Sequence, residues 1–295
     1  SISIGTLAGA GTLGLLIPPS IIMIVYGVMA NVSIAKLFIG GVLPGIVLAG
    51  LFMGYTIVWA LLNPDKVPPP DQNLTFAQKV YQSRHLIPVV SLIIAVLGSI
   101  YTGIATATEA AALGVVGSLI IAAVQGDLTW KTFIESLMGG TRLYCMIAMI
   151  LFGAAFLTLS MGYIGLPRHL AEWIISLHLS PLALIGVLTV FFIVLGCFLD
   201  GISMVVLTMG VLLPTIEAMQ MDLIWFGIFI VLVVEMAQIT PPVGFNLFVL
   251  QGMTKKDIAF IAKHAFPLFV MMVVMVLLMY FFPEIVNWLP RHMEG

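Results

Sequence analysis

Charged residues are what this sequence lacks most. Only 8% of its 295 residues are Asp, Glu, Lys or Arg, while 61% are hydrophobic. An ordinary soluble domain carries roughly a quarter charged residues, so these few charges cannot cover a water-facing surface. The net charge of -2 gives no basic patch for nucleic acid or another polyanion. The composition therefore predicts a protein of the lipid bilayer without a nucleic-acid partner.

Cysteines and catalytic motifs are also scarce. Cys145 and Cys197 lie far apart within apolar stretches, which predicts neither a disulfide framework nor a cysteine metal site. There is no H-E-x-x-H helix and no G-x-S-x-G elbow. Asp200 has no second intramembrane aspartate with which to form a paired-carboxylate site. We therefore expect neither an enzyme nor an organic cofactor.

Long uncharged stretches take up most of the chain. Each is long enough for the roughly 20 apolar residues that cross a membrane as a helix, and none shows the ten-residue alternation of a transmembrane barrel. The fold class is therefore an all-α polytopic membrane protein. The predicted spans are 8–30, 37–62, 87–102, 105–125, 143–163, 223–250 and 265–283.

The stretch 183–217 differs from these spans because Asp200, Gly201 and Ser203 interrupt two short apolar arms. A carboxylate at the centre of a membrane helix costs at least ~2.5 kcal/mol. We therefore predict a re-entrant hairpin with its tip at Asp200. This aspartate is expected to coordinate an ion, to cap the second arm, or to do both. The start of that arm would also favour an anion.

Proline pairs mark two predicted breaks. Pro18-Pro19 interrupts the first span and Pro241-Pro242 interrupts span 223–250, and the distance from each pair to the next proline, Pro44 or Pro267, is the same. Proline removes a helix donor and disfavours the helical conformation of the preceding residue. The matched spacing predicts an internal repeat with one broken helix in each half.

The lysine-rich loops predict the orientation of the repeat. Loops 63–85 and 252–264 should both be cytoplasmic, because such loops are enriched in Lys and Arg; the later part of 63–85 could form an interfacial helix. The two broken helices then run in opposite directions, as in inverted-repeat transporters with a site near the midplane. Residues 1–62 would end the first repeat, 86–295 would form the second, and the C-terminus would be periplasmic.

Oxygen-bearing groups surround both breaks. A hard cation such as sodium would take hydroxyl, amide and carbonyl oxygens of this type. The alternative is a packed kink in which these side chains bond across helices. The flanking residues are Thr12, Gly14 and Ser20 at the first break and Gln238, Thr240, Gly244 and Asn246 at the second.

Four other charged residues have open roles. Glu109 follows Thr106 where a helix would begin, so capping is expected. Glu235 precedes the second break and could pair or carry a proton. Arg142 and Arg168 lie at span ends, where side chains usually extend to the interface. Either arginine could instead meet a substrate carboxylate or a partner subunit.

Several motifs together resemble one transporter family. GTLGLLIPPSIIMIVYG (Gly11–Gly27), TEAAA (Thr108–Ala112), FLDG (Phe198–Gly201) and ITPPVGFNLF (Ile239–Phe248) occur in order, followed by a last span that ends in FFPE. The chain resembles the large, M-type membrane subunit of the tripartite ATP-independent periplasmic (TRAP) transporters. Ala107 departs from the family pattern, which usually has proline before Thr-Glu.

The resemblance implies an elevator-type, sodium-coupled secondary transporter with two inverted halves in the bacterial inner membrane. Its cargo would be a small organic acid such as a C4-dicarboxylate or sialic acid. The implied partners are a small, Q-type membrane subunit and a periplasmic substrate-binding protein. The chain opens on Ser1 within apolar sequence, and the family's first hairpin should precede it. We therefore expect the natural beginning, and half of one sodium site, to be missing.

The resemblance also implies site residues, since sodium would bind between a hairpin tip and a broken helix. The runner-up hypotheses are a proton-coupled transporter that uses Glu235 and an ion channel with the breaks as its filter. The expected sodium ligands are Thr12, Gly14, Pro18, Asp200, Gly201, Gln238, Thr240, Pro241 and Gly244. The expected substrate contacts are Ser20, Ser203, Thr240, Asn246 and Arg142.

Overall fold

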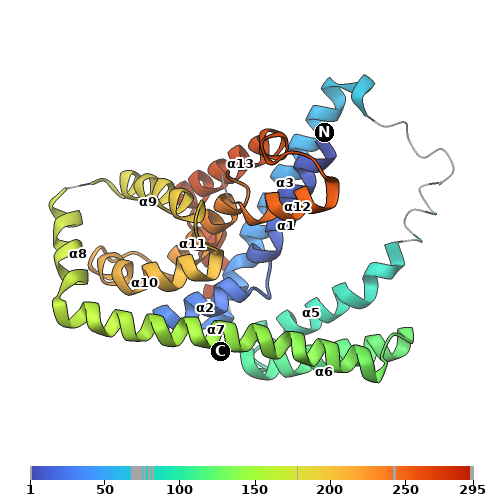
Figure 1. Ribbon diagram of the computed structural model, residues 1–295, viewed down its shortest axis with the longest axis horizontal. Helices are drawn as coiled ribbons and strands as arrows, with labels where there is room; N and C mark the ends of the chain where they lie inside the picture. Colours follow the sequence, from blue (N-terminus) through green and yellow to red (C-terminus); the bar gives the residue numbers. More distant parts are fainter. Residues whose placement is uncertain are drawn as a thin grey trace. The chain divides into compact units, whose positions relative to one another are not determined.

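The computed structural model describes residues 2–67, 75, 78, 81, 83–177, 179–241 and 244–292. Within them every regular element is a helix, as Figure 1 shows. The chain divides into two compact units. Unit 1 contains the residues up to Met53 and those from Leu143 to His292, and unit 2 contains the residues between Gly54 and Arg142.

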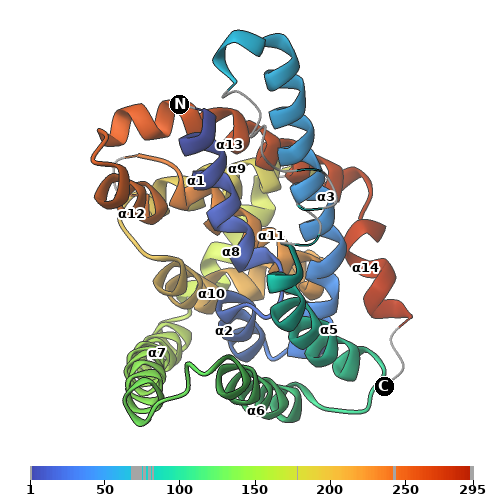
Figure 2. The same ribbon diagram turned by 90° about the vertical axis from the view of Figure 1, so that its right-hand side faces the viewer.

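Unit 1 is built around helix α11 (Leu223–Gln238). Every residue of this helix from Trp225 to Ala237 is buried. A helix that is hydrophobic on all sides has to be enclosed by other elements or by lipid, and here it is enclosed by protein (Figure 2). The helices against it include α1 (Ile2–Leu16), α2 (Ile21–Ala30), α9 (Pro181–Gly196), α10 (Gly201–Ala218) and α13 (Ile258–Phe281).

Both predicted breaks are present. Helix α1 ends at Leu16 and α2 begins at Ile21, with a bend of 40° between them. Helix α11 ends at Gln238, and α12 (Phe245–Thr254) follows it. Pro241 lies in this second break, while Pro242 falls outside the described residues. The predicted spans 8–30 and 223–250 therefore each consist of two helices.

The predicted hairpin at 183–217 corresponds to α9 and α10, which four residues connect. Asp200 is the N-cap of α10, and its Oδ2 accepts from the backbone N–H groups of Ile202 at 3.1 Å and Ser203 at 3.3 Å. This confirms the capping role of Asp200. The re-entrant placement of the hairpin in a membrane stays a prediction.

Helix α7 (Trp130–Ile164) begins well before the predicted span 143–163. Its start is capped by Thr129 and Thr132, whose hydroxyls accept from each other's N–H groups at 3.1 and 2.8 Å. Lys131 and Glu135 lie one turn apart at 3.9 Å. The predicted span was restricted to uncharged residues, whereas the helix begins at this earlier cap and includes charged residues.

The remaining helices of unit 1 are α3 (Ile34–Leu62, up to Met53), α8 (Leu166–Ser176) and α14 (Glu284–Arg291). Within α8, Arg168 donates to Glu172 at 2.9 Å, and both side chains are exposed. Arg168 therefore forms an exposed ion pair within a short amphipathic helix.

Unit 2 contains α5 (Ile87–Tyr101) and α6 (Ala107–Gln125), which pack closely together. The predicted cap of α6 is confirmed, because Glu109 accepts from the backbone N–H of Thr106 at 2.8 Å and Thr106 Oγ1 accepts from the Glu109 N–H at 3.3 Å. The short helices η1 (Pro64–Lys66) and η2 (Ser83–Leu86) lie in or beside the predicted loop 63–85. The interfacial helix predicted there falls largely outside the described residues.

Membrane-crossing capacity follows from the length and composition of the helices. Among the described residues, five helices (α3, α6, α7, α10 and α13) are long and apolar enough to cross a membrane, and the bent pair α1–α2 could make a sixth. Helices α5, α9 and α11 are apolar but shorter. This supports a polytopic membrane protein. The inverted repeat, its domain limits and the elevator movement stay predictions.

A hydrogen bond joins the C-terminal helix α14 to the residue that caps the start of α11. Asn287, which is 6% exposed, donates to Asp222 Oδ2 at 3.1 Å. The other oxygen of Asp222 caps α11 by accepting from the N–H groups of Ile224 at 2.8 Å and Trp225 at 3.1 Å. One carboxylate therefore serves both helices.

We expect Asn287→Ala to lower stability by about 1.5–3 kcal/mol, because it removes a hydrogen bond to a charged acceptor. Thermal unfolding in detergent, followed by tryptophan fluorescence, measures the change. Glu284→Gln on the same helix is the control, since it removes only an exposed ion pair with Arg291 and such pairs contribute little. Equal effects of the two substitutions would contradict the prediction.

Candidate functional site

The hairpin tip lies directly against the last turn of α11. A Cβ added to Gly201 would lie 2.7 Å from Val234 Cγ1 and 3.5 Å from Gln238 Nε2. A Cβ added to Gly196 would lie only 2.1 Å from the Cβ of Ala237. These two glycines therefore let both ends of the tip approach the helix closely.

A hydrogen bond also joins the tip to the second break. Cys197 Sγ donates to the carbonyl of Pro241 at 3.2 Å. Sequence reasoning assigned no function to Gly196 or Cys197. Only the two adjacent small residues directly before the FLDG motif could have indicated this close contact from the sequence. The structure thus brings together two segments predicted to share one ion site.

In the second break, local hydrogen bonds replace a helix hydrogen bond that proline cannot donate. The carbonyl of Ala237 lacks its usual helix donor because Pro241 has no N–H. It accepts instead from the N–H of Thr240 at 3.2 Å and from its hydroxyl at 2.9 Å. The N–H of Gly244 then donates to the Thr240 carbonyl at 3.1 Å. The break is therefore a folded turn with its hydroxyl and carbonyl oxygens gathered in one place.

Gly244 is required by the same crowding. A Cβ at this position would lie 2.7 Å from the Thr240 carbonyl oxygen and 2.8 Å from that of Gln238. Two backbone oxygens therefore face the space that a side chain would occupy. The crowding explains why a glycine stands at this position, and the role of Gly244 as a sodium ligand stays a prediction.

The negative charge at the tip belongs to Asp200. Besides the two backbone groups that it caps, its other oxygen accepts from the hydroxyl of Ser203. Asp200 is exposed, and it adjoins Gly201 beside Gln238. A carboxylate, an amide and a hydroxyl thus come from two neighbouring elements. The amide atom placed beside Gly201 is the nitrogen of Gln238, and the hydroxyls of Ser203 and Thr240 are engaged with Asp200 and with the Ala237 carbonyl. The sodium assignments therefore stay predictions.

The first break is arranged differently. Thr12 is 0% exposed, and its hydroxyl donates to the Gly9 carbonyl at 2.8 Å. Ser20 is 2% exposed and caps α2 through Met23 at 3.4 Å. Both hydroxyls are therefore engaged with the backbone. Gly14, by contrast, faces open space, and Pro18 is buried.

Helix α12, which follows the second break, lies close to α1, which precedes the first break. A Cβ at Gly11 would lie 3.7 Å from Asn246 Nδ2. This nitrogen is buried and has no hydrogen-bond partner. Asn246 therefore has a free N–H donor beside the first broken helix.

The predicted substrate residues are distributed over several elements. Ser20, Ser203, Thr240 and Asn246 all belong to unit 1, but no described cavity is lined by all four. Arg142 belongs to unit 2 and is exposed. The substrate assignments therefore stay predictions.

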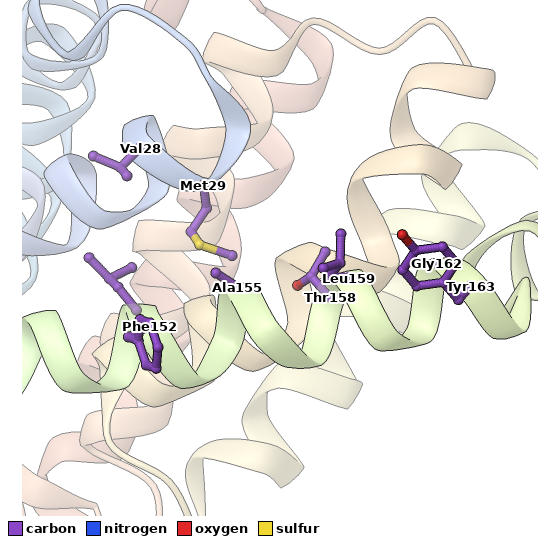
Figure 3. A pocket seen from close by; sticks show the side chains of 9 residues that line it. Val28, Met29, Phe152, Ala155, Thr158, Leu159, Gly162 and Tyr163 are labelled. Carbon is purple, nitrogen blue, oxygen red and sulfur yellow. The ribbon is translucent and has the colours of Figure 1, made fainter.

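One pocket in unit 1 lies elsewhere, with a volume of about 850 Å³. It is formed by the end of α2 and the C-terminal half of α7, as Figure 3 shows. Val28, Met29, Phe152, Leu159 and Tyr163 give it a largely apolar lining, and none of its lining residues is charged. It is therefore unsuited to a carboxylate.

Comparison with protein families places the chain among known transporter subunits. Residues 1–285 match the family described as tripartite ATP-independent periplasmic transporter, DctM component. The isethionate TRAP transporter permease protein DctMQ of Oleidesulfovibrio alaskensis is 32% identical over 287 residues, which are 96% of this chain and 44% of that protein. The chain thus spans less than half of this relative.

Two further relatives agree with this placement. The C4-dicarboxylate TRAP transporter large permease protein DctM of Pseudomonas aeruginosa is 30% identical, over 97% of this chain and 67% of that protein. The sialic acid TRAP transporter permease protein SiaT of Haemophilus influenzae is 29% identical, over 97% of this chain and 46% of that protein. These relatives are transporter subunits rather than enzymes. The chain belongs to the DctM family of TRAP transporters.

Proposed function

We propose that the chain acts as the large membrane subunit of a sodium-coupled importer of a small organic acid in the bacterial inner membrane. It works with a small Q-type membrane subunit and with a periplasmic protein that delivers the acid. Loops 63–85 and 252–264 face the cytoplasm. Membership of the DctM family supports this proposal. Isethionate, C4-dicarboxylates and sialic acid, which the relatives' names give, are all organic acids.

The observation that carries the proposal is the contact between the hairpin tip and the second break. Asp200, Gln238 and Thr240 would hold a sodium ion there, together with carbonyl oxygens of the break. Gly201 and Gly244 permit the close approach that such a site requires. A bound sodium ion would neutralise Asp200 and so remove its repulsion of an arriving acid. The chain's own contribution is to keep these oxygens in place, through the bonds of Asp200 and Thr240 described above.

Uptake by the complete transporter tests the proposal. Radiolabelled acid is offered to proteoliposomes with and without the binding protein, in sodium and with sodium replaced by choline. Uptake should require both sodium and the binding protein. Undiminished uptake in choline with an imposed pH gradient would instead indicate proton coupling. Conductance without the binding protein would indicate a channel.

Asn246 gives a separate prediction about the acid. We expect Asn246→Asp to raise the KM for the acid by about tenfold or more, because a free donor is replaced by a group that repels an anion. Initial uptake rates at saturating sodium measure this. Asn31→Asp is the control, since Asn31 is an exposed residue that ends α2. An unchanged KM for the Asn246 variant would remove this residue from the substrate site.

A further inference from the structure

Helix α12 has one exposed side that consists of apolar residues. These residues are Phe245, Phe248, Val249 and Met253. Their spacing of three or four positions places them on one face of the helix, and we call them the apolar stripe. The buried residues of α12 lie on its other side, and the helix packs against α1 and α13 within unit 1. An exposed apolar face of this kind marks a surface that contacts lipid or a partner.

Three lysines follow the apolar stripe in the sequence, where α12 turns into α13. We call Lys255, Lys256 and Lys263 the basic corner. All three are exposed, and none of them belongs to an ion pair found among the described residues. Asp257 is the one acidic residue between Phe245 and Ala265. The end of the apolar stripe therefore carries a net positive charge.

Lys255 adopts a backbone conformation that usually belongs to glycine. Its φ is 54°, and its N–H ends α12 by donating to the Gln251 carbonyl at 2.8 Å. A side chain in this left-handed conformation has a steric cost that glycine avoids. A positive charge does suit the C-terminal end of a helix, but this accounts for one lysine and leaves Lys256 and Lys263 unexplained.

The backbone of the basic corner is held in place by its neighbours. The N–H of Lys256 donates to the hydroxyl of Thr254 at 3.4 Å, and this hydroxyl donates to the Leu250 carbonyl of α12 at 2.6 Å. The first turns of α13 lie directly against α1, because a Cβ added to Gly5 would lie only 2.1 Å from the carbonyl oxygen of His264. The lysines therefore extend from a packed part of unit 1.

We propose that the apolar stripe and the basic corner together bind an anionic phospholipid. Its headgroup phosphate lies at the basic corner, and an acyl chain lies along the apolar stripe of α12. A soluble anion would match only the lysines, and a zwitterionic lipid would bring its own positive charge to them. Each lysine near an anionic membrane surface adds to the attraction. This inference goes beyond the proposed function and does not depend on sodium coupling.

Thermal unfolding of the complete purified transporter in a neutral detergent tests the proposal. A lipid that binds the folded protein raises its unfolding temperature as the lipid concentration rises. Phosphatidylglycerol should stabilise the transporter more strongly than phosphatidylcholine of the same chain length, and the difference should shrink in high salt. Equal stabilisation by the two lipids would overturn the proposal. Equal stabilisation by glycerol phosphate, which has no acyl chain, would indicate a soluble-anion site and would also overturn it.

The lysines are tested by the double variant Lys255→Asn, Lys256→Gln. Asparagine tolerates the left-handed conformation, so the turn is kept while both charges are lost. The apparent affinity for phosphatidylglycerol should fall by about tenfold or more. The variant Lys255→Arg, Lys256→Arg keeps the charges and should keep the affinity. Lys36→Gln, at an exposed position of α3, is the control for a lost surface lysine. Unchanged affinity in the neutral double variant would overturn the proposal.

The acyl chain is tested by Met253→Gln, which places a polar group within the apolar stripe and leaves all charges in place. Affinity for phosphatidylglycerol should fall several-fold, because apolar contact with the chain is lost. Met149→Gln on α7 is the matched control, since the two methionines are 72% and 73% exposed. Equal affinities in the two methionine variants would overturn the placement of the chain along α12.

Discussion

Asp200→Ala is expected to abolish sodium-dependent uptake while leaving the protein in the membrane. The substitution removes the negative charge next to Gly201, the residue of the tip that lies beside Gln238. It also removes the cap of α10, which costs about 1 kcal/mol of stability. Uptake of radiolabelled acid, measured over a range of sodium concentrations in proteoliposomes with the binding protein, gives the effect.

Asp200→Asn separates the charge from the cap. Asparagine ranks with aspartate as an N-cap, so the N–H groups of Ile202 and Ser203 keep an acceptor. We expect this variant to be stable, yet to need at least about tenfold more sodium, as expected when a group that supports a metal site is removed.

An N-cap control for this pair is Asp222→Asn. Asp222 caps α11 through the N–H groups two and three residues after it, as Asp200 does for α10, at 2.8 and 3.1 Å. It also accepts from Asn287, and it lies at the opposite end of α11 from the second break. Its variant should transport normally. Normal sodium dependence in Asp200→Asn would show that Asp200 only caps α10 and that the sodium assignment is wrong.

The broken helices and the hairpin were predictable because their causes are local. Proline removes a donor wherever it occurs, which explains the ends of α1 and α11 at Pro18-Pro19 and Pro241. An aspartate followed by glycine within an apolar run has few stable positions other than a helix start. The predicted tip at Asp200 therefore coincides with the N-cap of α10.

Contacts between distant segments were not predictable in this way. The sequence contains many glycines in apolar helices, and nothing local distinguishes Gly196, where a Cβ would meet Ala237, from Gly186, where a Cβ would meet nothing within 4 Å. For the same reason the sequence offered two roles for Glu235, pairing or proton transfer, and only packing showed that it is fully buried beside the backbone of Leu16. Nor did local signals locate the start of α7, since charged residues are compatible with an exposed helix.

Gly196→Ala is expected to displace the hairpin from α11 and to weaken sodium binding by about tenfold or more. A Cβ at this position would lie 2.1 Å from the Cβ of Ala237, whereas carbon atoms in contact are normally ~3.5–4.0 Å apart. The two helix backbones must therefore move apart. Overpacking of this kind costs about 1–3 kcal/mol, and the movement occurs beside the proposed sodium ligands. Sodium titrations of uptake and of thermal unfolding measure both effects.

Gly186→Ala on the same helix is the matched control, because a Cβ there meets nothing within 4 Å. Alanine is favoured over glycine within a helix by about 1 kcal/mol, so this variant should be as stable as the parent or more so. The two glycine substitutions thus differ only in their surroundings. Equal behaviour would mean that α9 and α11 are not in contact in the membrane.

Ala237→Gly combined with Gly196→Ala tests the contact directly. Removing the Cβ of Ala237 leaves the new methyl group near Met204, whose flexible end lies 3.2 Å away and can move. Sodium affinity should then recover, although Ala237→Gly alone costs about 1 kcal/mol of helix stability. If the double variant loses less sodium affinity than the sum of the two single losses, the difference is the coupling expected of residues in contact. It would show that the distance between hairpin tip and broken helix, and not the identity of either residue, controls sodium binding.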